Sequence, residues 1–347
     1  MPQVHAATGH TADEDMVVKR IAFGSCAKQW EPQPIWTAIA ATDPDLFLFI
    51  GDAIYGDWHG EEVFAPTPES LKEDWDRLGA IPAFGRFREQ VPIMATWDNH
   101  DYGKHDGGAE FDLKGQSKDL FLNFFGEPAD TQRRRREGIY DAKIFGPPGK
   151  RLQVILLDTR TFKGPYIKDD RSKEKKAAMG IRGQYLPNDD PQATLLGAAQ
   201  WQWLETELKK PAEIRLIASS TQVVADEKAM EEWGNFPIER RRLLDLISTV
   251  PGVVLLSGNV HFSEISKSDE GSYPIYDFTS SGMTHTTPAY ADLRNRRRIA
   301  GPFTAFNFGL VDVDWDNPAG PRIALTAHDV DGKAVFETAF ALQELTP

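Results

Sequence analysis

The sequence predicts an α/β fold in which mixed sheets form one large unit. Apolar runs of about four to six residues, each followed by a polar cluster, alternate with amphipathic stretches almost from end to end. Runs of this kind suit strands that are buried on both faces. No repeat period stands out, and no linker rich in Gly and Ser divides the 347 residues.

The elements alternate in order along the chain. In the first half we expect helices at 34–41 and 68–78, and strands at 17–23, 46–50, 91–96 and 152–157. The second half continues with helices at 198–208 and 239–250, and strands at 214–218 and 253–256. From Tyr273 onward the segments are shorter and rich in Thr, Tyr and Phe, which predicts strands that include 304–311 and 323–330.

The first residues predict a flexible N-terminal segment at 1–18, ahead of a single domain at 19–347. They are polar, small and slightly acidic, without the basic start and apolar centre of a signal peptide. We interpret them as the front of an exported protein whose signal has been removed, which favours a periplasmic or secreted location and leaves the cytoplasm open. One cysteine excludes an intramolecular disulfide and does not reveal the compartment.

Charge and hydropathy exclude two classes of partner. The net charge of −13 argues against nucleic-acid binding, which normally requires a basic face. The basic run Arg133–Arg136 is interpreted as a solvated surface. No apolar run reaches the roughly 20 residues that a transmembrane helix needs. The oligomeric state is left open.

Polar side chains follow nearly every predicted strand. In open α/β sheets, ligand sites form beyond the carboxyl ends of the strands. The segments found there are 24–26 with Cys26, 51–57 with Asp52, 97–103 with Asn99, 158–160 with Arg160, 219–222, and 258–261 with His261.

Each of these residues also has a purely structural interpretation. Cys26 could fill a small buried space, Asp52 could cap a helix, and Tyr55 could be plain packing. His261 could be a hydrogen-bonded core histidine, and Arg160 could pair with Asp158. Their recurrence at successive strand ends favours a common site that binds metal or phosphate.

The order of these blocks resembles a known family. Gly51-Asp52 with Tyr55, Asn99-His100-Asp101 and Gly258-Asn259-Val260-His261 are similar to the signature of calcineurin-like metallophosphoesterases. Cys26, at the place of the usual Asp-x-His block, narrows the resemblance to the alkaline phosphatase D (PhoD-like) family, from about residue 19 to about residue 310. The resemblance implies a four-layer α/β/β/α sandwich of two mixed sheets, with a metal site at the carboxyl ends of the strands.

The resemblance also implies two metal ions. Cys26, Asp52, Tyr55 and His261 match a first site for Fe³⁺, which suits anionic thiolate and phenolate ligands. Asp52 would bridge to a second site for Ca²⁺ or another divalent ion such as Mn²⁺ or Zn²⁺, completed by Asn99 and Asn259. Many relatives have Asp in place of Asn259. The segment 102–106 also departs from the family pattern, and it puts His105 near the pocket.

The activity that the resemblance implies is hydrolysis of a small phosphomonoester or phosphodiester by a metal-activated hydroxide. His100 would assist departure of the ester oxygen with Asp101 as its orienting partner, and Arg160 would contact a phosphate oxygen. The sequence contains no G-x-S-x-G nucleophile motif and no P-loop.

Two alternatives remain. One is a phospholipase-type or organophosphate-type esterase of the same fold, whose pocket Trp30, Trp58 and Trp233 would line for an apolar leaving group. The other is a degenerate, non-catalytic protein that binds a phosphate ligand, and the neutral Asn259 is the feature that favours it.

Overall fold

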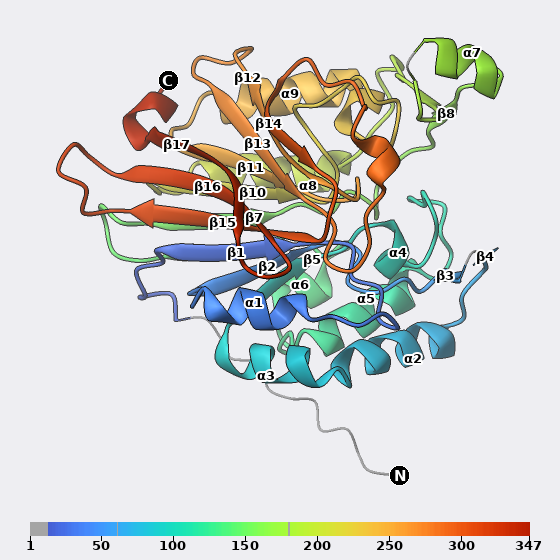
Figure 1. The fold of residues 1–347 in the computed structure, drawn as a ribbon, viewed down its shortest axis with the longest axis horizontal. Helices are drawn as coiled ribbons and strands as arrows, with labels where there is room; N and C mark the ends of the chain where they lie inside the picture. The colour runs from blue at the N-terminus through green and yellow to red at the C-terminus, as the bar shows by residue number, and fades with distance from the viewer. Residues whose placement is uncertain (1–12, 61, 180) are drawn as a thin grey trace.

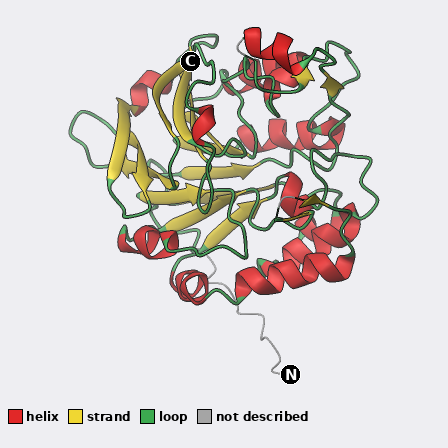
Figure 2. Cartoon of the chain, turned by 45° about the vertical axis from the view of Figure 1, so that its right-hand side comes forward, coloured by secondary structure: helices red, strands yellow, loops and turns green. Residues whose placement is uncertain are grey.

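Two large mixed sheets pack face to face in the computed structural model, which describes residues 13–60, 62–179 and 181–347. Helices cover the outer side of each sheet, so the layers follow the order α/β/β/α (Figures 1 and 2). The predicted fold class is confirmed.

The first sheet has six strands in the described part of the chain. Its central strands run parallel, and the C-terminal strands add to β1 antiparallel. The spatial order is β17 (Ala334–Ala341), β16 (Arg322–Asp329), β15 (Asn307–Asp314), β1 (Arg20–Gly24), β2 (Leu46–Ile50) and β5 (Ile93–Thr96).

Strand β2 shows why an unbroken apolar run forms a central strand here. Alternate side chains of a strand point to opposite faces. Leu46, Leu48 and Ile50 belong to the core between the two sheets, whereas Phe47 and Phe49 belong to the core under the helices. Both Phe rings contact Trp36 edge to face, with centroids 5.2 and 5.9 Å away. Each face of β2 is therefore buried by a different layer.

The second sheet has seven strands among the same described residues. Its four middle strands are parallel, and both edges are antiparallel. The spatial order is β14 (Arg298–Phe303), β12 (Ser263–Ser268), β13 (Ile275–Ser280), β11 (Val253–Ser257), β10 (Ile214–Ser219), β7 (Leu152–Leu156) and β6 (Asp141–Phe145).

The helices divide between the two outer faces. The first sheet is covered by α1 (Ile35–Ala41), α2 (Pro68–Gly79), α3 (Pro82–Gln90) and α5 (Lys114–Phe124), which lie below it in Figure 1. The second sheet is covered by α8 (Gly197–Leu208) and α9 (Pro237–Ile247). Short elements carry the loops: α4 (Asn99–Tyr102), α6 (Gln132–Arg135), α7 (Lys173–Ala178), β3 (Trp58–His59), β4 (Glu62–Val63), β8 (Ile167–Lys168) and β9 (Tyr185–Leu186).

The N-terminal segment packs earlier than predicted. Residues 1–12 of the expected flexible segment lie outside the described residues. The carbonyl of Glu14 accepts a hydrogen bond from Gly146 at 2.8 Å, and Val18 is buried in the core between the sheets. The Asp45 carboxylate accepts hydrogen bonds from the amides of Lys19 and Arg20, at 2.7 and 2.8 Å, just where β1 begins. No helix in the described residues is long and apolar enough to cross a membrane.

Candidate metal centre and active site

The carboxyl ends of both sheets meet at one edge of the sandwich. In the first sheet, the amide of Cys26 donates to the carbonyl of Gly51 at 3.4 Å. The carbonyl of Ser25 accepts from Met283 at 3.2 Å, which links the first sheet to the loop after β13. Polar residues from distant parts of the chain are therefore brought into one place, as the parallel topology requires.

Cys26 lies fully buried at this edge. Its Sγ is 3.4 Å from Asp52 Oδ2 and 3.0 Å from Ser281 Oγ. Burial, and next the nearby carboxylate of Asp52, raise the pKa of the Cys26 thiol well above its usual value. A bound cation would reverse this effect, because metal coordination favours the thiolate.

The Asp52 side chain is positioned by the turn at Gly51 and by a backbone amide of α4. Its Oδ1 accepts the amide hydrogen of His100 at 3.2 Å. The preceding Gly51 has φ +103°, and a Cβ there would lie 2.6 Å from Asp98 Cβ, so only glycine fits this turn. Burial, followed by the charges of Asp98 and Asp101, raises the pKa of Asp52 well above its usual value. Several buried acids thus share a region that a cation would stabilise.

Tyr55 and His261 are connected through a histidine that the sequence did not single out. The Tyr55 hydroxyl is 2.9 Å from His285 Nε2, which is 3.3 Å from His261 Nε2. Burial and the neighbouring His100 and Lys28 lower the pKa of His261 to about 3, so its imidazole is neutral, the form that binds metals. The signal for His285 was the polar run Thr284–Thr287 after β13.

Four of the predicted ligands share an uncommon backbone conformation. Cys26, Asp52, Asn259 and His261 have φ values of 63°, 52°, 69° and 61°. Non-glycine residues rarely adopt positive φ, and such strain gathers at functional sites. Only three other non-glycine residues in the described part of the chain do so. The shared conformation favours a functional site at these strand ends.

The two predicted amide ligands differ in their surroundings. Asn99 Oδ1 is buried and has no hydrogen-bond partner among the described residues. An unpaired buried acceptor costs about 1–3 kcal/mol. Asn259 Nδ2 instead donates to Glu231 Oε2 at 3.4 Å, which leaves its Oδ1 available. The unpaired oxygen of Asn99, together with the buried acids, fits a metal ion.

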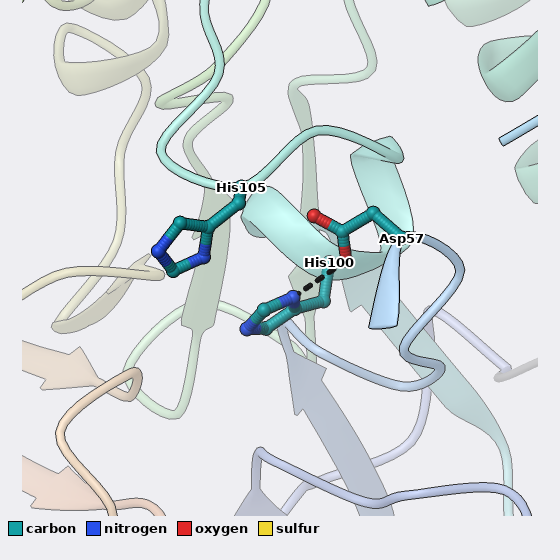
Figure 3. Close-up of side chains that lie close together, drawn as sticks. All are labelled: Asp57, His100 and His105. Atoms are coloured by element: carbon teal, nitrogen blue, oxygen red, sulfur yellow. Dashed lines mark hydrogen bonds and ion pairs between the residues drawn. The ribbon is translucent and has the colours of Figure 1, made fainter. Parts of the chain in front are cut away.

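His100 is oriented by Asp57 rather than by the predicted Asp101. Its Nδ1 is 2.7 Å from Asp57 Oδ1 (Figure 3). Its ring stacks on that of Tyr55, with centroids 4.2 Å apart. Both oxygens of Asp101 accept backbone hydrogens, from Asp98 at 2.6 Å and Ala53 at 3.1 Å. Asp101 therefore caps the first turn of α4, and the contact with the imidazole is made by Asp57 instead.

A second group of metal-ligand side chains includes His100. Ligand atoms of Asp57, His100 and His105 all lie within 4.8 Å of one another, and Figure 3 shows the two rings facing the same space. His105 is the more exposed of the two histidines, and burial lowers its pKa. The departure in segment 102–106 thus brings a nitrogen to the site, as expected.

Arg160 is fully buried and pairs with carboxylates instead of lying open to a phosphate. Its buried guanidinium pairs with Asp98 through Nη2 at 2.5 Å and with Glu231 through Nη1 at 2.6 Å. Only its backbone amide contacts the side chain of Asp158, at 2.9 Å. The predicted contact with a phosphate oxygen does not fit this burial, because two carboxylates already occupy the guanidinium.

A cavity of about 650 Å³ opens above the cluster. Its floor carries Asn99, His100, Asn259 and His261. Trp58 lines its wall, whereas Trp233 is buried in the core and donates from Nε1 to Ser219 Oγ at 2.9 Å. The edge of the Trp30 ring faces Tyr55, with centroids 6.3 Å apart. The tryptophans therefore do not form a common apolar pocket.

Two solved structures have a fold similar to that of this chain. The solved structure of PhoD superposes with a TM-score of 0.69 at 16% identity, covering 97% of this chain and 74% of PhoD. Purple acid phosphatase PPD1 from yellow lupin (Lupinus luteus) seeds gives 0.63 at 14% identity, covering 96% of this chain and 55% of the lupin chain. These likenesses establish the fold. A search of curated proteins finds no match.

The family comparison covers most of the chain. The sequence model described as PhoD-like phosphatase matches residues 21–298, which span the strand ends that carry Cys26, Asp52, Asn99 and His261. The earlier resemblance, drawn from these same motifs, is thereby confirmed. The chain belongs to the PhoD-like phosphatase family.

Proposed function

We propose that this protein is a metal-dependent hydrolase of phosphoric monoesters or diesters. The observation that carries the proposal is the contact of the Cys26 thiol with the Asp52 carboxylate, beside the linked Tyr55, His285 and His261. Thiolate, phenolate, carboxylate and imidazole together suit Fe³⁺. His285 lies between Tyr55 and His261 and would either support these ligands or join them.

The second ion would be held by oxygen atoms. Asp52 accepts a hydrogen bond from the backbone amide of His100, the residue that follows Asn99. Asn99 Oδ1 has no hydrogen-bond partner in the described chain. Asn259, oriented by Glu231, would present the other amide oxygen. This set favours Ca²⁺, with Mn²⁺ or Zn²⁺ as alternatives. When bound, the ions would supply Lewis acidity that lowers the pKa of water and offsets charge on the phosphoryl oxygens.

His100 would deliver the proton to the departing ester oxygen. It lines the cavity, and Asp57 fixes its ring through Nδ1, so Nε2 is left for the substrate. Asp57 therefore takes the positioning role first expected of Asp101.

Metal analysis combined with an activity assay tests the proposal. Purified protein should contain iron and at least one divalent ion, and phenolate or thiolate charge transfer to ferric iron should give it colour. It should hydrolyse a chromogenic monoester, a chromogenic diester or both. A colourless, fully active preparation that holds only magnesium would exclude the iron assignment. If metal-replete protein hydrolysed neither ester, the alternative of a non-catalytic protein that binds a phosphate ligand would be favoured.

The role of His100 predicts a dependence on the leaving group. His100→Ala should lower kcat about a hundredfold or more for alkyl phosphates. The loss should be less than about tenfold for nitrophenyl phosphate, because its nitrophenolate leaving group departs without protonation. Asp57→Asn should show the same dependence on the leaving group, with smaller losses of kcat. Asp101→Asn serves as the control and should affect stability without this trend. Equal losses across the leaving-group series would indicate that His100 positions metal instead.

The neutral Asn259 predicts a weak second site. Added Ca²⁺ or Mn²⁺ should raise activity over a measurable range, and Asn259→Asp should lower the half-saturating concentration about tenfold, because a carboxylate binds such ions more tightly. The contact with Glu231 adds repulsion in this variant, so Asn259→Asp with Glu231→Gln should show the larger shift. Unchanged metal dependence in both variants would remove Asn259 from the ligand set.

A further inference from the structure

A basic segment between β8 and β9 lines part of the cavity. Between β8 and β9 the chain leaves the sandwich and forms α7, which stands apart from the sheets in Figure 1. Residues 172–183 contain four basic side chains and one acidic side chain, in a protein whose net charge is −13. We call Lys173, Lys176 and Arg182 the cationic rim, because all three line the cavity.

The positive charges of the cationic rim are not neutralised by ion pairs with described residues. Lys173 and Arg182 are exposed and have no ion pair with any described residue. Lys176 Nζ donates to the carbonyl of Gly183 at 3.2 Å, which leaves two of its hydrogens free. Positive side chains that face a cavity without partners attract an anion.

The acids of the same cavity do not neutralise the rim. Glu231 Oε1 pairs with the buried Arg160 at 2.6 Å. Asp106 accepts hydrogen bonds from Tyr185 and, at 3.3 Å, from Gln184. Both carboxylates are thus turned to their own partners.

Aromatic side chains line the wall of this cavity as well. Trp58, His105 and Tyr290 line it, and the ring of His105 is 5.8 Å from Trp58 and 5.6 Å from His100. Rings of this kind can contact an uncharged body that links two charged groups. The cavity therefore offers one place for an anion at the strand ends and a separate one at the rim.

We propose that the cationic rim binds a second phosphate group on the alcohol part of the substrate. The inference rests on the proposed function, because the reacting phosphate is taken to lie at the strand ends. The substrate class is then a small phosphate ester that carries another phosphate some distance from the scissile bond. The rim selects among esters and leaves the reacting groups unchanged.

Two matched esters and two matched variants test this inference. Hexanediol bisphosphate carries the second phosphate, and hexyl phosphate lacks it. The combined variant Lys173→Ala, Arg182→Ala should lower kcat/KM about tenfold for the bisphosphate and less than about twofold for hexyl phosphate. Lys175→Ala is the control, because Lys175 lies on the same helix but does not line the cavity. It should change neither value.

Binding separates this inference from the proposed function. In calorimetric titration with a non-hydrolysable alkane bisphosphonate, in which a methylene replaces each ester oxygen of hexanediol bisphosphate, the combined variant should bind about tenfold more weakly than wild type, and the difference should shrink as salt is added. If wild type hydrolyses neither these esters nor the chromogenic monoester and diester, the proposed function fails, and the titration alone decides whether the rim binds anions. Equal losses for both esters, or equal bisphosphonate affinity in the variant and wild type, would overturn the inference.

Discussion

Cys26→Ala is expected to lower turnover by several orders of magnitude while the protein stays folded. The side chain is small, and the cores on either side of β1 do not depend on it. As a ligand, however, its thiolate would be lost from the first site, so iron content should fall in parallel with kcat. Metal analysis, circular dichroism and steady-state kinetics on one preparation measure all three quantities.

A buried filler would behave differently in the same measurements. It would cost at most about 1–2 kcal/mol of stability and leave metal and rate near their normal values. Ser263→Ala is a matched control, because Ser263 is equally buried and small but donates to Thr279 on the neighbouring strand. Thiol reagents should modify Cys26 only after metal is stripped. A Cys26→Ala protein with full metal and near-normal turnover would refute the ligand role.

Arg160→Met is expected to cause the largest loss of stability, about 3–5 kcal/mol. Removing one partner of a buried ion pair leaves an uncompensated charge. Here both Asp98 and Glu231 would lose their partner. Arg322→Met is the control, since Arg322 is exposed on β16. Urea unfolding measures both variants. A loss below about 1 kcal/mol for Arg160→Met would show that the network is not needed for the fold.

The pH dependence of this loss has a defined sign. Arg160 holds the pKa of Glu231 at about 2 in the folded state, below its ordinary value of 4.5. The stabilisation is therefore present above about pH 4.5 and disappears as the pH falls toward 2. The difference in unfolding free energy between wild type and Arg160→Met should accordingly be larger at pH 7 than at pH 4. Arg160→Met with Glu231→Gln should regain part of the loss.

The sequence was sufficient for the fold class because the strong signals were the buried strands. The predicted strand at 46–50 coincides with β2, and the helix at 198–208 differs from α8 by one residue. Helices α3 and α5 were missed. In α5, polar and glycine residues interrupt the apolar spacing, and the helix is held mainly by Phe121 and Leu122 against other helices. Such packing is decided by tertiary contacts.

The candidate site was predictable as a group of residues, and less so as a set of roles. Parallel strands deliver their carboxyl ends to one edge, so Cys26, Asp52 and His261 were expected to meet. The partner of His100 is Asp57, 43 residues away, and Arg160 pairs with Glu231 across 71 residues. No local pattern encodes these pairings. The role of Asp101 was taken from the family resemblance, but Asp101 directly follows His100 on α4, and adjacent residues on a helix point in different directions.

The position of β1 has a consequence for synthesis of the protein. β1 lies between β2 and β15, and the Arg20 side chain bonds Asp312 at 2.6 Å across 292 residues. While the ribosome is still translating the middle of the chain, the strand that leads into Cys26 has a bare edge on one side. Bare edges invite pairing with other chains. Until β15 emerges from the ribosome, this edge of β1 is therefore open to pairing with other chains.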